Sequence, residues 1–238
     1  MDKSDNVRIF VAYKYSTTMY ATISADIVSS TSLTSKETIR LKQNLKELFS
    51  LLEERYPKFW GRQIKGDYIE CLIPNVADAF RIALILKTFI KSFEVSTGQS
   101  TKEFRTYGLR MAIGIGAMRI VNKTQNILDG EAIYLSGRAI ENMNALYKGT
   151  FSIEIEDERL QAQLQTIAIL TDALMNNMTR RQCEVLYHKL LSAKEFEIAQ
   201  RLGIQQSSVN GHATSANWYC IETAVNYFER INFDHHEP

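Results

Sequence analysis

The sequence predicts an α+β protein: a long domain that mixes strands and helices, followed by a small all-α domain. Residues 18–156 contain short segments with strand patterning, separated by amphipathic helical segments. From residue 157 onward, the apolar residues recur only at helical spacing. We therefore expect domains at 18–156 and 178–238. A connecting helix at 157–177 would join them rigidly, because no Pro/Gly/Ser-rich linker occurs there.

Composition excludes several classes of protein. The 238 residues carry 28 basic and 27 acidic side chains, a net charge of +1, so no overall field attracts the chain to nucleic acid. The N-terminus lacks the apolar core of a signal peptide, and no segment approaches the roughly 18 apolar residues of a membrane span. Three scattered cysteines form no metal-ligand pattern. We expect a cytoplasmic protein with reduced thiols and without a membrane partner.

The first predicted unit is a strand followed by a helix. Residues 20–28 form a short apolar run that ends at Asp26 and a Ser/Thr cluster, as expected of a central strand. Thr34 and Glu37 have the spacing of a capping box, and leucines then recur every three or four residues until Pro57. These features predict a helix with one buried face.

The next segments predict a hairpin, a buried helix and a loop. The alternation of residues 59–73 is interrupted by Gly66-Asp67, a pair that suits a tight turn. Asn75 is positioned to cap the following helix, whose residues are apolar on most faces. The polar residues 96–105 predict a loop.

The second half of the long domain begins with a strand that is apolar on one face only. Within residues 107–116, large apolar residues alternate with Arg110 and small residues such as Gly114. Glycine inside a strand is typical of places where a ligand or another backbone comes close. A turn at Asp129-Gly130, a helix and a last strand follow, which gives the order βαββαβαβ.

Two aspartates lie where predicted strands end. Asp26 closes the first strand and Asp67 lies in the hairpin turn, so both reach one edge if these strands are neighbours. Carboxylate oxygens at such an edge suit Mg²⁺ or Mn²⁺ together with the phosphates of a nucleotide. The candidate phosphate-binding residues are Ile27, Ser29, Ser30, Thr31 and Lys65. Aspartate in these places also commonly binds only backbone donors, which is the alternative interpretation.

Four segments, in chain order, resemble the marker segments of class III nucleotide cyclases. They are ADIVSST at 25–31, Gly66-Asp67, RMAIGIG at 110–116 and DGEAIYLSGRAIE at 129–141. The resemblance implies a ferredoxin-like nucleotide-cyclase palm domain in which Asp26 and Asp67 hold the metal ions. It also implies a catalytic role for Arg138, in a site shared by two subunits, and therefore a homodimer.

Other positions differ from the cyclase pattern. Tyr134 stands at the position of the asparagine that accompanies the arginine. Gln63 and Ile127 stand at the two base-reading positions, which are lysine and an acidic residue in the family. A buried base edge needs matched donors and acceptors for discrimination, so efficient cyclase activity is not expected. We expect a nucleotide or nucleotide-like ligand, and we keep catalysis as the alternative.

The C-terminal residues predict a helix-turn-helix. Thr179 and Gln182 have capping-box spacing, and Gly203 stands where a left-handed residue ends a helix. The segment EIAQRLGIQQSSVNGH at 197–212 resembles the DNA-binding unit of sigma-factor region 4 and of LuxR-type regulators. Double-stranded DNA is therefore an expected partner.

Two sets of side chains would contact DNA. The residues expected at base edges are Gln205, Gln206, Ser207, Asn210 and Thr214. The residues expected at phosphates are Arg180, Arg181, Lys194 and Arg201. From residue 179 onward, six basic residues stand against seven acidic ones, which leaves packing or dimerisation as the alternative role of this unit.

Across residues 18–230 the chain is similar to the SatD-type family of bacterial proteins, in which a cyclase-like domain precedes a helix-turn-helix. Our first hypothesis is a nucleotide-responsive, DNA-binding transcriptional regulator with Mg²⁺ or Mn²⁺ at Asp26 and Asp67. The second is a divergent metal-dependent nucleotidyl cyclase or nucleotidyltransferase that uses the same two aspartates. The third is a non-catalytic interaction scaffold.

Overall fold

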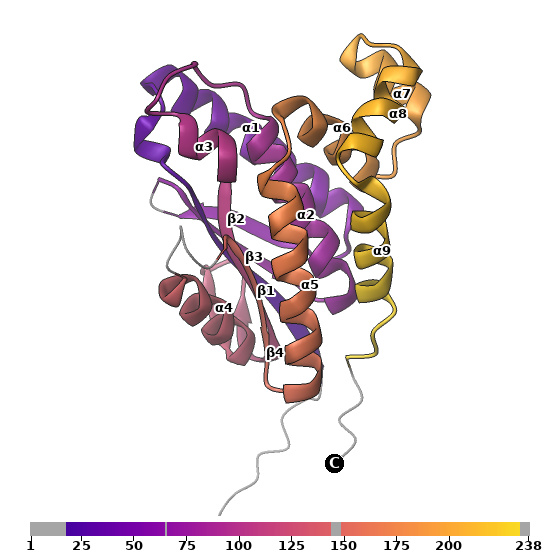
Figure 1. The fold of residues 1–238 in the computed structure, drawn as a ribbon. Helices are drawn as coiled ribbons and strands as arrows, with labels where there is room; N and C mark the ends of the chain where they lie inside the picture. The colour runs from indigo at the N-terminus through magenta and orange to yellow at the C-terminus, as the bar shows by residue number, and fades with distance from the viewer. Residues whose placement is uncertain (1–17, 65, 144–148, 234–238) are drawn as a thin grey trace, which may run out of the picture.

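The computed structural model describes residues 18–64, 66–143 and 149–233, which form a mixed α+β fold around one curled sheet (Figure 1). The strand order is β2-β3-β1-β4-β5, and β6 pairs in parallel with β4 while the other pairs are antiparallel. The strands are β1 (Met19–Ile27), β2 (Trp60–Ile64), β3 (Tyr68–Ile73), β4 (Leu109–Asn122), β5 (Ile127–Gly130) and β6 (Phe151–Ile155).

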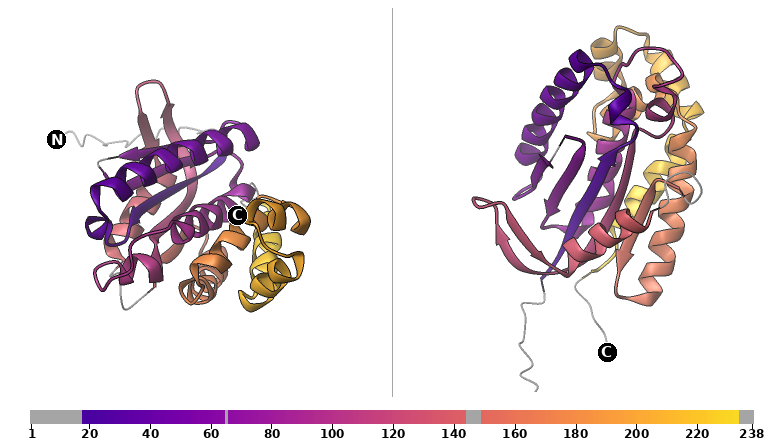
Figure 2. Two further views of the ribbon diagram at one scale, coloured as in Figure 1. Left: turned by 90° about the horizontal axis from the view of Figure 1, so that it is seen from above. Right: turned by 90° about the vertical axis from the view of Figure 1, so that its left-hand side faces the viewer.

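Helices cover both faces of the sheet, and the C-terminal helices pack beside them (Figures 1 and 2). Helices α1 (Ser35–Arg55) and α2 (Ala79–Ser92) lie on one face, and α4 (Glu131–Asn142) lies on the other. The remaining helices are α3 (Lys102–Tyr107), α5 (Glu158–Asn176), α6 (Arg180–Leu190), α7 (Glu195–Leu202), α8 (Gln206–Ser215) and α9 (Trp218–Glu229). Short 3₁₀ turns, η1 (Ser30–Ser32) and η2 (Val76–Asp78), precede α1 and α2.

Strand β1 is central, as its apolar run predicted, and its two faces differ. Ile23 and Ala25 are fully buried in the large core beneath α1 and α2. On the other face, the hydroxyl groups of Thr22 and Ser24 each lie 2.9 Å from the hydroxyl of Ser136 in α4. These buried hydroxyls satisfy one another, so α4 is held to the sheet by polar contacts as well as by packing.

Gly114 of β4 explains why this strand is apolar on one face only. A Cβ atom at this position would overlap the carbonyl oxygen of Ala132 and would lie 2.5 Å from the backbone nitrogen of Ser136. Of the two explanations that a strand glycine allows, close approach of another backbone is therefore the correct one. Helix α4 sits directly on the strand.

Both predicted capping boxes are confirmed, at Thr34 with Glu37 and at Thr179 with Gln182. The cap predicted at Asn75 is wrong in detail. The Asn75 amide donates to the Asp78 carboxylate at 2.8 Å and accepts no backbone N–H of the helix.

Two other local predictions are corrected. Residues 102–107, expected to be partly loop, form α3, because Phe104 is fully buried and anchors an otherwise polar turn of helix. Asp129-Gly130 is not a turn but the end of β5, which pairs with the far part of β4. The turn lies at 123–126, and these two strands project from the body as a hairpin (Figure 2).

The C-terminal helices share a core with the sheet. Phe80 of α2 stacks on Phe151 of β6 and on Phe228 of α9, with ring centroids 5.6 and 5.4 Å apart. Arg81 and Glu229 form an ion pair at 2.6 Å beside them. Within the described ranges, no helix combines the length and the apolarity needed to cross a membrane.

Candidate functional site

The two predicted aspartates come from neighbouring strands. Asp26, the penultimate residue of β1, lies opposite Tyr68 of β3, and the backbone N–H of Ile27 donates to the Asp67 carbonyl at 3.2 Å. The predicted adjacency of strand end and hairpin turn is therefore confirmed for the backbone. It exists because β1 and β3 are hydrogen-bonded along their full shared length.

The carboxylates of these aspartates have different protein partners. Arg110 donates to both oxygens of Asp26, from Nε at 2.9 Å and from Nη2 at 2.6 Å. This hydrogen bonding raises the pKa of Arg110 further, against the effect of its partial burial. The Asp67 carboxylate instead accepts a hydrogen bond from the Ser30 hydroxyl at 2.6 Å. Within residues 18–64, 66–143 and 149–233, no cluster of three or more His, Cys, Asp or Glu residues could hold a metal ion.

Arg110 also belongs to this site, which the sequence pattern did not indicate. It lies on β4, directly across from Asp26 in the strand register, and it also donates to the Met143 carbonyl at 3.0 Å. The sequence did contain a signal for a special role, because Arg110 is the one large side chain on a strand face that otherwise carries alanine and glycine. Only the long-range pairing of β1 with β4 reveals what this arginine binds.

The serine-rich segment after β1 differs from the expected phosphate cradle. Ser29 is in the left-handed region (φ 52°) and its hydroxyl donates to the Glu103 carboxylate at 2.6 Å. Thr31 lies within η1, and α1 begins at Ser35, as the capping box at Thr34 predicted, so η1 separates the serine cluster from the helix N-terminus. Lys65 lies outside the described residues. The hydroxyls of Ser29 and Ser30 thus already bind carboxylates.

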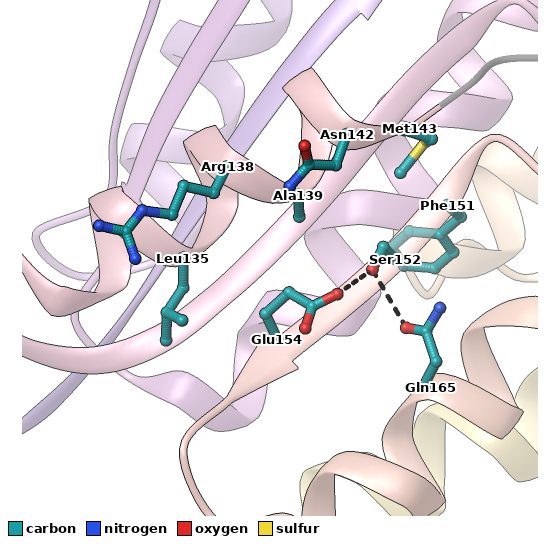
Figure 3. A pocket seen from close by; sticks show the side chains of 9 residues that line it. All are labelled: Leu135, Arg138, Ala139, Asn142, Met143, Phe151, Ser152, Glu154 and Gln165. Carbon is teal, nitrogen blue, oxygen red and sulfur yellow. Dashed lines mark hydrogen bonds between the residues drawn. The ribbon is translucent and has the colours of Figure 1, made fainter.

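Arg138 lies at one end of a pocket of about 390 Å³ between α4, β6 and α5 (Figure 3). Its apolar lining residues include Leu135 and Phe151. On the opposite side, the Ser152 hydroxyl donates to the Glu154 carboxylate at 2.5 Å. Among the described residues, no carboxylate forms an ion pair with Arg138. Arg138 is also exposed, so it can contact an external anion.

The other positions compared with cyclases are occupied by local contacts. The Tyr134 hydroxyl donates to the Asp129 carboxylate, and this hydrogen bond lowers the pKa of Asp129. The Gln63 amide donates to the Gly66 carbonyl, so it serves the hairpin turn. Ile127 is exposed on β5.

Helices α7 and α8 have the predicted boundary. Gly203 follows α7 in the left-handed conformation (φ 63°), and α8 begins at Gln206. Val209 and Ala213 of α8 are buried. All five predicted base-contacting residues, Gln205, Gln206, Ser207, Asn210 and Thr214, are exposed.

The predicted phosphate-contacting residues fall into two groups. Arg180 and Arg181 both pair with Glu184, at 3.4 and 2.8 Å. Lys194, at the start of α7, and Arg201, near its end, have no acidic partner among the described residues. Lys194 and Arg201 are therefore the cations of this group that remain available to a phosphate.

Comparison with known proteins finds no matching family model and no matching curated protein. Two solved structures are similar, both described as a bacterial light-regulated adenylyl cyclase. The first is 16% identical, with a TM-score of 0.41, and covers 61% of this chain and 80% of its own. The second is 14% identical, with a TM-score of 0.38, and covers 57% of this chain and 42% of its own.

Proposed function

We propose that this chain is a DNA-binding transcriptional regulator whose cyclase-like α+β domain binds a nucleotide or nucleotide-like ligand without turning it over. The observation that carries the proposal is the exposed polar face of α8. Gln206, Asn210 and Thr214 follow one another at intervals of four residues, so they share one face of the helix. Val209 and Ala213, on the adjoining face, are buried and anchor the helix in the core.

This face has the chemistry of base recognition. The amides of Gln206 and Asn210 can each pair with the two polar atoms that adenine presents in the major groove. Helices α7 and α8 lie at one end of the molecule, away from the sheet, which leaves room for a duplex (Figure 1). Lys194 and Arg201 on α7 would contact phosphates.

The Asp26–Arg110 pair favours ligand binding over catalysis. Metal-dependent nucleotidyl transfer requires carboxylate oxygens that are free to coordinate a cation. Both oxygens of Asp26 already bind the guanidinium group, which supplies the positive charge that a metal ion would bring. Asp67 and Arg138 remain as candidate contacts for the phosphates of a ligand, with Mg²⁺ or Mn²⁺ bound through the ligand and Asp67.

DNA binding is tested with a duplex library and with the DNA upstream of the chain's own gene, by fluorescence anisotropy. We expect sequence-selective binding that the double variant Gln206→Ala/Asn210→Ala weakens at least tenfold, because each bidentate contact contributes about 1–3 kcal/mol. Gln43→Ala, which changes an exposed residue of α1, is the matched control. Arg201→Ala should weaken binding to all sequences and reduce the salt dependence by about one phosphate contact. Failure to bind any duplex at low salt contradicts the proposal.

Turnover is tested by incubating the chain with each labelled nucleoside triphosphate and Mn²⁺. We expect the nucleotide to remain intact while it raises the melting temperature of the protein. Formation of a cyclic or transferred product that Asp67→Ala abolishes would instead establish the divergent cyclase or nucleotidyltransferase. The absence of any thermal shift with every nucleotide would leave the interaction scaffold.

A further inference from the structure

Helices α5 and α9 lie side by side (Figures 1 and 2). Their side chains form an exposed apolar groove between them. The groove has a volume of about 620 Å³, and nearly all of its lining residues are apolar or aromatic. Leu170 is 62% exposed and Tyr219 is 79% exposed on its two sides. Large apolar side chains clustered in this way typically mark an interaction site.

Charged groups are missing from the centre of this face. Between Arg159 and Asn176, α5 contains a single charged residue, Asp172, and that side chain is buried. On α9 the charged residues are Glu222 and Glu229, and Glu229 is paired with Arg81. The residues that line the groove therefore offer no charged group to a partner.

We propose that the α5–α9 face binds a second copy of this chain through a two-fold symmetric interface. In such an interface each residue near the axis meets its own copy, so a central charge would face a like charge. A charge-free centre avoids this repulsion. Tyr219 and Tyr227 flank the groove, and aromatic residues of this kind are enriched in interface cores. The Tyr227 hydroxyl also donates to the Gln163 side chain at 3.0 Å, which ties α9 to α5.

The size of the face suits a homodimer core. Twelve residues of α5, from 162 to 173, extend over about 18 Å at 1.5 Å per residue, and two helices are about 20 Å wide. The two helices thus present a footprint of about 360 Å², and an interface of roughly 800 Å² per partner would extend from it into a polar rim. The two grooves would interdigitate through Leu170 and Tyr219 of each copy.

The dimer has a consequence for α8. Helix α9 follows α8 after a single turn at Ala216 and Asn217, so pairing through α9 would fix the distance between the two α8 helices. This consequence rests on the proposed DNA binding, because paired recognition helices read half-sites one helical turn apart. The proposed dimer does not depend on DNA binding, and dimer formation is measured without DNA.

The oligomeric state of the full chain is measured by sedimentation equilibrium and by light scattering after gel filtration. We expect a dimer for the native chain and for Ile39→Glu, which changes a similarly exposed residue (69%) on α1. We expect Leu170→Glu and Tyr219→Glu to be folded monomers, because each would place two like charges in an apolar interface. A monomeric native chain overturns the proposal, and so does a dimer that Ile39→Glu alone disrupts.

Thiol reactivity gives a second test, which locates the interface on the native chain. Cys220 is exposed on this face, whereas Cys71 and Cys183 are buried. We expect alkylation of Cys220 by a maleimide to slow severalfold as the protein concentration rises through dimer formation, and Leu170→Glu to abolish this protection. An unchanged rate in a dimeric sample shows that the copies associate through another face. A protected dimer that binds no duplex would refute the proposed function and leave this interface in place.

Discussion

Arg110 and Asp26 face each other across β4 and β1, and the guanidinium group binds both carboxylate oxygens at 2.6 and 2.9 Å. Because Arg110 also donates to the Met143 carbonyl beyond α4, one side chain joins two strands to the end of a helix. The pair is about three-quarters buried, with exposed fractions of 27% for Arg110 and 26% for Asp26. Both oxygens of Asp26 therefore already have a cationic partner within the protein.

Removing this guanidinium should release the carboxylate. We expect Arg110→Met to lower the free energy of unfolding in urea by about 1–3 kcal/mol, since hydrogen bonds to a charged group are lost. We also expect Mn²⁺ to raise the melting temperature of this variant more than that of the native chain. Arg62→Met, which breaks a comparable pair with Glu70, is the control that should gain no Mn²⁺ response. Equal Mn²⁺ effects on the native chain and Arg110→Met would show that Arg110 does not block the site.

Two glycines near α4 should respond in opposite directions to alanine. Gly114→Ala places a methyl group against the backbone of α4, so we expect a loss of about 1–3 kcal/mol or more, as for overpacked cores. Gly137 lies within α4 and a Cβ atom there meets nothing within 4 Å. Gly137→Ala should therefore gain about 0.5–1 kcal/mol through helix propensity. Urea unfolding measures the stability of both variants. A Gly114→Ala variant as stable as the native chain would refute the close packing of α4 on β4.

Much of the fold could be predicted because its signals are local. The capping boxes at Thr34 and Thr179 are fixed by residues three apart, and the left-handed end of α7 is fixed by Gly203 alone. The alternation of β4 also predicted that another backbone or a ligand covers Gly114. Each of these signals depends on neighbours in the sequence, so no tertiary information was needed.

The rest depends on contacts between distant residues. Helix α3 forms because Phe104 reaches a core built by other segments, which its polar neighbours do not reveal. The Asp26 carboxylate was interpreted as a metal ligand because its partner, Arg110, is 84 residues away. The sequence pattern located both residues on strands, but the β1–β4 register that pairs them is a property of the whole sheet.

A buried ion pair links α2 to α5. Lys87 Nζ lies 3.0 Å from the Asp172 carboxylate and donates to the Thr150 hydroxyl at 2.7 Å, and both charged side chains are almost fully buried. We expect Lys87→Met to cost about 3–5 kcal/mol, because Asp172 is left as an unpaired buried charge. The double variant Lys87→Met/Asp172→Leu should lose less than the sum of the two single variants. Urea unfolding of the native chain, the two single variants and the double variant measures the coupling energy between Lys87 and Asp172. Strictly additive losses of stability would refute this coupling.

Stability should also depend on pH through Lys91. Its ammonium group is buried beside α5 and donates to the Thr106 carbonyl at 2.6 Å, and burial lowers the pKa of Lys91 to about 8. In the unfolded chain a lysine ionises near pH 10.4. Between these values the unfolded state binds more protons, so this lysine makes the folded state more stable as the pH rises.

The buried thiol of Cys183 acts in the opposite direction, because burial raises its pKa to about 11 and stability falls once the unfolded thiol ionises above about pH 8.5. The lysine contribution is therefore isolated by comparing variants. We expect the difference in unfolding free energy between the native chain and Lys91→Met to rise between pH 8 and 10, by at most about 1.4 kcal/mol per pH unit. Lys102→Met, at the exposed start of α3, is the matched control. A difference that stays flat over this range would show that Lys91 is charged in the folded protein throughout, despite its burial.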